Sequence, residues 1–227
     1  MTLHCAFIGF GKSTTRYHLP YVLNRKDTWH VAHIYRRRAK PEEQSPQYSH
    51  IHFTSDLDEV LNDPLVKLVV VCTHADSHFE YAKKALEAGK NVLVEKPFTP
   101  TIAEAKELFA LAKSKGLTVT PYQNRRFDSC FLTAKKAIES GKLGDIVEIE
   151  SHFDYYRPVA ETQPGLPQDG SFYGLGVHTM DQIISLFGRP DHVAYDIRSL
   201  RNKANPDDTF EAQLFYGDPK ALARAPD

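Results

Sequence analysis

The chain has 227 residues, a net charge of −1, 41% hydrophobic residues and 25% charged residues. This composition is ordinary for a globular protein and gives no reason to expect nucleic acid or an acidic membrane as a partner. No apolar run approaches the roughly 20 residues of a membrane span, and no basic segment followed by an apolar one opens the chain. Its three cysteines and eleven histidines form no disulfide or metal signature, so we expect a cytoplasmic protein without a bound metal.

Short apolar strands and capped helices are predicted to alternate through the first half of the chain. The predicted strands cover residues 3–8, 30–35, 67–72, 91–94 and 117–121. The predicted helices are 13–23, a short one capped at 55–58, one opened by a capping box at 77–80 and ended by Gly89, and one opened by a second box at 101–104 and ended by Gly116. This alternation predicts an α/β fold with a doubly wound parallel sheet of the Rossmann type.

The pattern changes after Tyr122, where we place the boundary between a dinucleotide-binding domain, 1–122, and a second domain, 123–227. The second part is predicted to contain helices 129–140 and 177–187 and strands 146–156, 193–199 and 210–215, with a loop at 157–170 and an irregular tail at 218–227. Strand 146–156 alternates apolar and polar residues, as a half-covered sheet does. We expect an incomplete α+β open-sheet domain that serves substrate binding and oligomerisation.

A glycine loop joins the first predicted strand to the first predicted helix, as a dinucleotide-binding fingerprint requires. Gly9 permits a tight turn, and Gly11 lets the backbone come close to a pyrophosphate at the start of the helix. Thr14 stands where the third Gly or Ala is usual, so an ordinary turn is the alternative. A P-loop is excluded because Ala6 occupies the position of its first glycine. The residues expected to meet the cofactor here are Gly9, Phe10, Gly11, Lys12 and Ser13.

The end of the second predicted strand bears on the choice between NAD and NADP. A Rossmann domain that prefers NAD usually has an Asp or Glu about 20 residues after the glycines. Here Tyr35 is followed by Arg36, Arg37 and Arg38, with no acid beside them. Arginine binds a 2′-phosphate through its charge and its paired donors. A solvated basic turn is the alternative, but the position favours NADP, with Arg36 and Arg37 as ligands.

Several segments in order resemble the Gfo/Idh/MocA oxidoreductase family (glucose-fructose oxidoreductase, inositol dehydrogenase and relatives). The segments are the glycine loop with His18 seven positions after Gly11, Thr73 and His78 after the central strand, residues 88–97 ending in Glu95-Lys96-Pro97, residues 124–127, residues 141–144, and residues 176–181 around His178. The resemblance covers the chain from Cys5 to about Phe215, and Glu95-Lys96-Pro97 is its most specific part.

The resemblance implies hydride transfer between a nicotinamide cofactor and a sugar, polyol or related carbonyl compound. It implies that Lys96 and His178 are catalytic, Lys96 as a charge that stabilises an alkoxide and His178 as the general acid or base. The further residues implied at the cofactor are Thr73, His74, His78 and Glu95, together with Lys96 itself. The residues expected on the substrate side are Arg125, Tyr156, Tyr173 and Asp181. Pro97 makes a cis bond after Lys96 an option.

Departures from the family pattern keep a second interpretation open. Gly174 stands where active members often have an aspartate, and His74 stands where proline is frequent; His74 either contacts the nicotinamide or caps a turn. Members usually exceed 300 residues, so we expect a C-terminally truncated relative. Full-length relatives can form homo-oligomers, which we do not expect of this chain. The alternative function is a non-catalytic dinucleotide-binding protein or an inactive truncated member.

Overall fold

The computed structural model describes residues 2–156 and 165–217. The predicted tail, 218–227, and residues 157–164 of the predicted loop lie outside the described residues. The chain divides into two compact units, Met1–Tyr122 and Gln123–Asp227. The first contains a large parallel sheet, and the second contains helices and a two-stranded antiparallel sheet.

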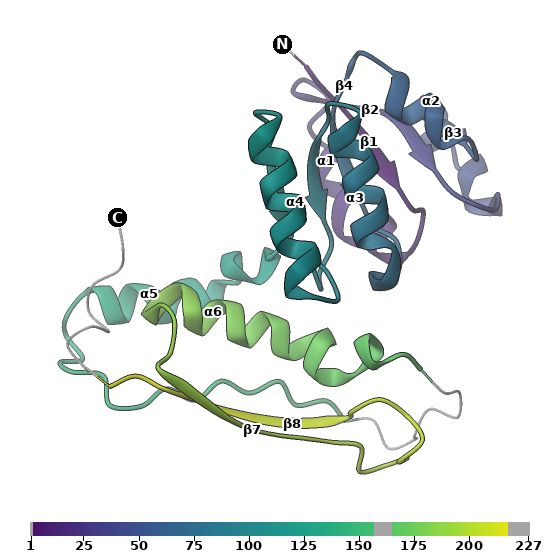
Figure 1. The fold of residues 1–227 in the computed structure, drawn as a ribbon. Coiled ribbons are helices and arrows are strands. Elements are labelled where there is room, and N and C mark those ends of the chain that lie inside the picture. Colours follow the sequence, from purple (N-terminus) through teal and green to yellow (C-terminus); the bar gives the residue numbers. More distant parts are fainter. Residues whose placement is uncertain (1, 157–164, 218–227) are drawn as a thin grey trace. The chain divides into compact units, whose positions relative to one another are not determined.

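The first unit is built on six parallel strands in the order β3-β2-β1-β4-β5-β6 (Figure 1). The strands are β1 Leu3–Ile8, β2 Trp29–Tyr35, β3 His52–Thr54, β4 Val66–Val71, β5 Asn91–Val94 and β6 Val119–Pro121. This is the Rossmann strand order, which confirms the predicted fold class. The chain winds outward from β1 to one edge and from β4 to the other, so the order reverses between these neighbours. In open α/β sheets, ligands bind at the carboxyl ends of the strands beside such a point.

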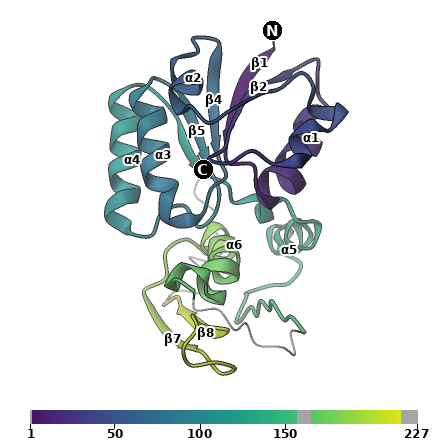
Figure 2. The same cartoon turned by 90° about the vertical axis from the view of Figure 1, so that its right-hand side faces the viewer.

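Helices cover both faces of this sheet (Figure 2). They are α1 Leu19–Leu23, α2 Leu57–Asn62, α3 His78–Glu87 and α4 Ile102–Ser114. Buried residues of α2, α3 and α4, among them Leu86 and Leu108, pack with β-strand residues in one core cluster. Leu19 of α1 packs with Phe7, Val31 and Ile34 in the other. Within residues 2–156 and 165–217, no helix combines the length and the apolar character that a membrane crossing requires.

The helix caps follow the sequence in one case and depart from it in another. The predicted capping box of α4 is confirmed, because Thr101 Oγ1 accepts from the Glu104 backbone N–H and the Thr101 N–H is bonded to the Glu104 side chain. The box predicted for α3 is wrong. Ser77 lies in a short 3₁₀ turn, Ala75–Ser77, and its hydroxyl donates to the His74 carbonyl at 2.8 Å.

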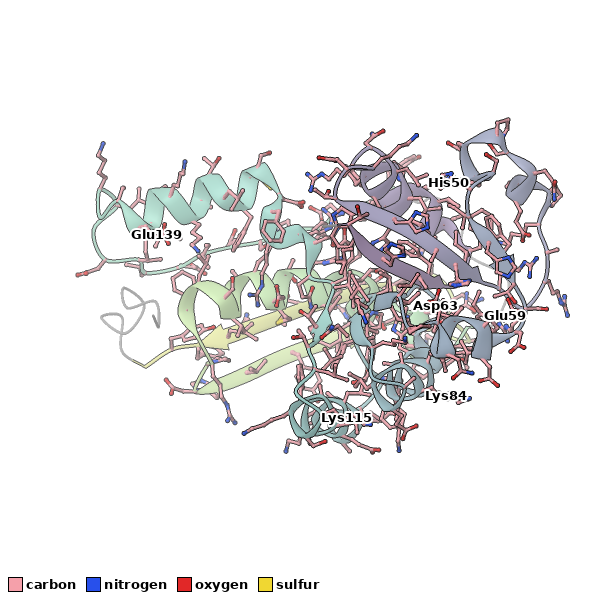
Figure 3. All side chains as sticks on the ribbon, turned by 90° about the horizontal axis from the view of Figure 1, so that it is seen from above. His50, Glu59, Asp63, Lys84, Lys115 and Glu139 are labelled. Atoms are coloured by element: carbon pink, nitrogen blue, oxygen red, sulfur yellow. The ribbon has the colours of Figure 1, made fainter. Side chains whose placement is uncertain are left out.

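Two histidine–carboxylate pairs tie the β2–β3 edge of the sheet to α2. Asp63, which follows α2, lies 2.8 Å from His33 of β2, and Glu59 of α2 lies 2.6 Å from His52 of β3. Figure 3 labels Glu59 and Asp63 on this side of the unit.

Strand β3 was not predicted, because three residues carry too little hydrophobic pattern to be recognised in the sequence.

The second unit packs one long helix along a β-hairpin (Figure 1). Its elements are the turn Asn124–Phe127, α5 Ser129–Glu139, the turns Pro167–Asp169 and Phe172–Gly176, α6 Val177–Phe187, β7 His192–Arg198 and β8 Thr209–Phe215. Strands β7 and β8 pair antiparallel from His192↔Phe215 to Arg198↔Thr209. The ring of Phe172 meets that of Phe210 at 5.5 Å, and the ring of Phe187 meets that of Tyr216 at 6.0 Å, which fixes both ends of the helical segment on the hairpin.

The predicted strand 146–156 is wrong. No regular secondary structure is assigned to these residues, and nearly all of them are exposed. A strand exists only where a neighbour supplies its backbone hydrogen bonds. Among the described residues, β7 and β8 pair only with each other, so the segment has the pattern of a half-covered strand but no strand beside it.

Candidate functional site

Residues Gly9–Gly11, which we call the glycine turn, follow β1 at the point where the strand order reverses. The backbone of this turn packs closely against the residues that follow β4. Gly9 has φ of +110°, and a Cβ added to it would sit 2.6 Å from the carbonyl oxygen of Cys72. Only glycine meets both conditions. A Cβ added to Gly11 would meet no protein atom within 4 Å. Packing therefore demands Gly9 but not Gly11, which borders open space where another molecule can approach the backbone.

The residue that departs from the fingerprint, Thr14, closes the turn. It is fully buried, and its hydroxyl donates a 2.7 Å hydrogen bond to the Gly9 carbonyl. Residues Thr14–His18 form a π-helical turn before α1 begins, where a single helix over 13–23 was predicted. Thr14 therefore supports the fingerprint geometry through its hydroxyl, at a position where Gly or Ala usually permits close helix–strand packing.

Next to the turn lies a polar group that we call the Glu95 cluster: the buried residues His18, Cys72 and Glu95 and the half-buried Ser13. His18 Nε2 lies 2.9 Å from Glu95 Oε1, and the Ser13 hydroxyl donates to the same oxygen. Glu95 Oε2 accepts from the Lys96 backbone N–H at 3.1 Å. The Tyr122 ring covers His18 at a centroid distance of 4.4 Å. Glu95 thus joins the first turn after the glycines to the segment after β5.

Burial and hydrogen bonding act against each other on the pKa of Glu95, whereas burial dominates at Cys72. Burial alone would raise the pKa of Glu95, but the hydrogen bonds from His18 and Ser13 hold it below its ordinary value. Burial, with the neighbouring charge of Glu95, raises the pKa of the Cys72 thiol to about 12. The donor atoms of His18, Cys72 and Glu95 lie within 4.8 Å of one another, as a metal site would need. The carboxylate and imidazole already satisfy each other and the thiol stays protonated, so their own hydrogen bonds account for the arrangement.

Lys96 lies two residues after the end of β5 and is half-buried at the carboxyl end of the sheet. Its backbone is held by Glu95, and its bond to Pro97 is cis. The glycine turn and Lys96 therefore lie at the same end of the sheet, where the parallel strands have their carboxyl ends. A lysine there places a positive charge where ligands of open α/β sheets bind.

The segment after β4 holds three more of the residues predicted at the cofactor, Thr73, His74 and His78. His78 is fully buried, with Nδ1 2.8 Å from the Pro97 carbonyl oxygen and Nε2 3.1 Å from that of Thr73. These contacts explain His78 as a link between two loops. His74 is exposed and lies 3.0 Å from Asp76, and the hydroxyl oxygens of Thr73 and Ser77 lie 2.9 Å apart. Thr73 and His74 therefore lie at the carboxyl end of the sheet, whereas His78 is buried in the interior.

After β2, Arg36 meets an acid that the local sequence did not suggest. Its Nε and Nη2 donate to the two carboxylate oxygens of Glu43 at 2.8 and 2.9 Å. Glu43 lies in the 3₁₀ turn Pro41–Gln44, and its only sequence signal is its place seven residues after Arg36. Arg37 is exposed. We expected no acid beside the arginine run, and this was wrong, because Glu43 of the following turn contacts Arg36.

Two further residues of the predicted cofactor set differ sharply in exposure. Phe10 is 4% exposed, and its ring packs edge-on against Tyr48 and Phe53, so its side chain belongs to the core. Only its backbone lies in the turn. Lys12 is exposed. Its position after Gly11 places it beside the open space described above.

In the second unit, His178 is buried near the start of α6, as its place in the sequence predicted. Its ring lies 6.4 Å from that of Phe153, and the Arg125 guanidinium lies 4.8 Å from the same ring. Arg125 also donates to Asp128 at 3.0 Å, and its carbonyl accepts from Gln182 of α6. His178 and Arg125 thus gather around Phe153, which sequence reasoning did not single out.

The other predicted substrate residues do not join this group. Asp181 accepts two hydrogen bonds from Arg126, at 2.6 and 2.7 Å. Tyr156 is 93% exposed. Tyr173 lines a hollow of about 480 Å³ whose lining does not include His178. The ion pair with Arg126 explains the position of Asp181. Neither Tyr156 nor Tyr173 belongs to the group around His178.

Two family models match the chain. A model described as an oxidoreductase family with an NAD-binding Rossmann fold matches residues 3–123, and the C-terminal α/β domain of the same family matches residues 135–224. The chain is 91% identical to the uncharacterized oxidoreductase YhhX of Escherichia coli over 224 residues, which are 99% of this chain and 65% of that protein. It is 34% identical to the scyllo-inositol 2-dehydrogenase (NADP(+)) IolW of Bacillus subtilis, over 97% of this chain and 62% of that protein.

A solved structure described as an oxidoreductase from Bacillus cereus is 51% identical and superposes with a TM-score of 0.90, covering 96% of this chain and 62% of that one. The chain therefore spans just under two-thirds of the length of these relatives. The two family models together extend through both units, and the first includes the glycine turn and the segment around Lys96. The chain belongs to the Gfo/Idh/MocA oxidoreductase family, with an NAD-binding Rossmann fold in its first unit.

Proposed function

We propose that this protein is a cytoplasmic oxidoreductase that transfers a hydride between NADP(H) and a sugar, polyol or related carbonyl compound. The observation that carries the proposal is the glycine turn at the reversal point of the sheet, with Lys96 on the same edge. The three cysteines are free thiols, which suits a reducing compartment.

The residues present fit a dinucleotide. Gly9 makes the turn, Gly11 leaves open space beside the backbone, and the exposed Lys12 adds positive charge next to it. Arg36, Arg37 and Arg38 stand after β2, where the ribose end of a dinucleotide is recognised in this fold. The basic run supports NADP over NAD. So does the printed cofactor of the B. subtilis relative.

The catalytic roles follow from the chemistry of two side chains. A bound nicotinamide supplies the hydride acceptor or donor. The backbone of Lys96 is held at the carboxyl ends of the strands by its hydrogen bond to Glu95, and its ammonium orients a substrate hydroxyl and stabilises its alkoxide character. His178 of the second unit takes or returns the hydroxyl proton. The inositol relative supports a polyol as the substrate class.

A second candidate is a non-catalytic dinucleotide-binding protein. Gly174 has no side chain to assist His178, and Asp181 is bound to Arg126. Both observations weaken a proton relay around His178 and leave the first unit intact.

Titration of the chain with NADPH and NADH, followed by oxidation assays on polyols and aldoses, tests both candidates. Lys96→Ala is expected to abolish turnover while NADPH still binds. Lys106→Ala, an exposed lysine on α4, is the matched control and is expected to change neither. Binding without any turnover in the unaltered chain supports the second candidate, and absence of dinucleotide binding rejects both.

A further inference from the structure

Four histidines of β1, β2 and β3 form two pairs across neighbouring strands. His4 of β1 is in register with His30 of β2, and His33 of β2 is in register with His52 of β3. The ring centroids are 4.6 Å apart in the first pair and 5.4 Å apart in the second. Residues in register on neighbouring parallel strands point to the same face of the sheet. The members of each pair therefore share a face.

An extra residue in β2 brings both pairs to the same face. His30 and His33 are three positions apart, so in a regular strand they would point to opposite faces. On β1, His4 is in register with His30, and Ala6, only two positions later, is in register with His33. His4 and Ala6 share a face, so His30 and His33 share it as well. The spacing in the sequence could not show this grouping, which is why the histidines gave no metal signature.

His33 has one ring nitrogen bound to a carboxylate and the other without a partner. Its Nε2 lies 2.8 Å from Asp63 Oδ2, whereas its Nδ1 is buried and has no hydrogen-bond partner among the described residues. Buried polar atoms are rarely left unsatisfied. A metal-binding histidine usually donates one ring N–H to a carboxylate, carbonyl or water and binds the metal through the other nitrogen. His33 and Asp63 match that arrangement, with Nδ1 as the nitrogen left for a cation.

His4 and His30 supply two more imidazoles beside it. Both side chains are half-buried, and within residues 2–156 and 165–217 neither ring forms a hydrogen bond or an ion pair. Two imidazoles on one tetrahedral zinc ion have ring centroids about 5 Å apart, close to the 4.6 Å between His4 and His30. Burial, with the neighbouring charges of His4, His50 and His33, lowers the pKa of His30 below 6.5. Its ring is therefore neutral at neutral pH, which is the form that binds metals.

We infer that His4, His30 and His33 bind a Zn²⁺ ion, and that Asp63 is a positioning residue that orients His33. Imidazole nitrogens suit Zn²⁺, and three of them leave a fourth tetrahedral position for water. In the part of the chain that the structure describes, only the Glu95 cluster has three donor atoms within 4.8 Å of one another. The histidine rings therefore turn about their side-chain bonds to close on the ion.

This site is separate from the proposed cofactor site. His4 and His30 are each the second residue of their strand, whereas the glycine turn follows the opposite, carboxyl end of β1. The ion would connect β1 to β2 and stabilise the first unit without contact with the dinucleotide. Loss of the site should therefore leave NADPH affinity unchanged, so its failure and that of the proposed function are distinguishable.

Equilibrium dialysis of the full chain against zinc chloride at neutral pH tests the inference. We expect one saturable Zn²⁺ site, which His4→Ala or His30→Ala abolishes. Asp63→Asn is expected to weaken binding by about tenfold to a hundredfold, the usual effect of losing the carboxylate behind a metal-bound histidine. His152→Ala, an exposed histidine of the second unit, is the matched control and is expected to change nothing. Zn²⁺ should also raise the melting temperature of the unaltered chain and of the control, but not that of His30→Ala.

Two results would overturn the inference: no saturable Zn²⁺ binding, or binding that is unchanged in both His4→Ala and His30→Ala. Loss of binding in Cys72→Ser, with the histidine variants unaffected, would assign the ion to the Glu95 cluster and reject the inference as well. Melting curves without metal show whether each variant folds. Where an alanine variant does not fold, His4→Gln or His30→Gln takes its place, because glutamine keeps much of the side-chain volume without an imidazole nitrogen.

Discussion

Glu95 and His18, 77 positions apart in the sequence, meet with 2.9 Å between Oε1 and Nε2 in the interior of the first unit. Through this contact the carboxylate connects the helical turn after the glycines with the backbone of Lys96. One buried acid thus sets the spacing between the proposed cofactor turn and the proposed catalytic lysine. The charge of Glu95 should therefore affect the stability of the fold as well as the geometry of the site.

We expect the Glu95 carboxylate to make stability depend on pH in the acid range. Its pKa in the folded protein lies below the ordinary value of 4.5, so it stabilises the fold above that pH. That stabilisation is lost as the pH falls below about 4.5 and through the folded-state pKa. Urea unfolding between pH 7 and pH 3 measures it. Glu95→Gln is expected to lower stability at pH 7 by about 1–3 kcal/mol and to flatten the acid dependence.

Glu107→Gln, an exposed residue on α4, is the control for that measurement. Parallel acid profiles for the unaltered chain and Glu95→Gln would show that other carboxylates carry the dependence.

Replacing each glycine of the turn by alanine should affect a different property, stability at Gly9 and NADPH binding at Gly11. Gly9→Ala places a Cβ 2.6 Å from the Cys72 carbonyl oxygen at φ of +110°, so we expect a loss of stability of about 1–3 kcal/mol or more. Gly11→Ala adds a methyl group to open space and should leave the melting temperature nearly unchanged. NADPH binding should nevertheless weaken, because the methyl enters the space proposed for the pyrophosphate. Thermal unfolding and NADPH titration of both variants check this, and normal NADPH affinity in a folded Gly11→Ala would contradict the proposed placement.

The parallel sheet was predictable because its strands are short apolar runs bounded by glycines and caps. Five of the six strands of the first unit were expected close to where they lie. The three-residue strand β3 and the π-helical turn Thr14–His18 were not, because neither leaves a periodic pattern. The segment 146–156 shows the opposite failure. Its alternation describes a half-covered strand, but pairing depends on a neighbour that the local sequence does not specify.

The candidate site was predictable where one segment defines it and unpredictable where distant residues meet. The glycine turn follows from a local pattern, and Lys96 follows from the family resemblance of residues 88–97. The contact of Arg36 with Glu43 depends on how a 3₁₀ turn folds back, and that of Arg126 with Asp181 joins residues 55 positions apart. Asp181 looked like a substrate ligand because the sequence showed its position and not its partner.

The Arg126–Asp181 pair is therefore expected to act in stability. Arg126 is 48% exposed and Asp181 is 15% exposed, so solvent screens the pair and its coupling should be small, about 0.5–1 kcal/mol. Urea unfolding of Arg126→Ala, Asp181→Asn and the double variant gives this coupling as a double-mutant cycle. Additive effects on stability, together with a raised KM in Asp181→Asn alone, would restore Asp181 as a substrate residue.

The three thiols should react at very different rates. Cys130 is exposed, whereas Cys5 and Cys72 are buried and burial raises the pKa of each to about 12. Because the thiolate is the reactive form, one thiol should react rapidly with a disulfide reagent in the native protein and all three in denaturant. Cys130→Ser should remove the rapid phase. Cys72 lies against the glycine turn, so its slow reaction reports opening of that turn, and saturating NADPH should slow it further by stabilising the closed form. A Cys72 rate unaffected by NADPH, in a chain that binds NADPH, would place the dinucleotide away from the Gly9 turn.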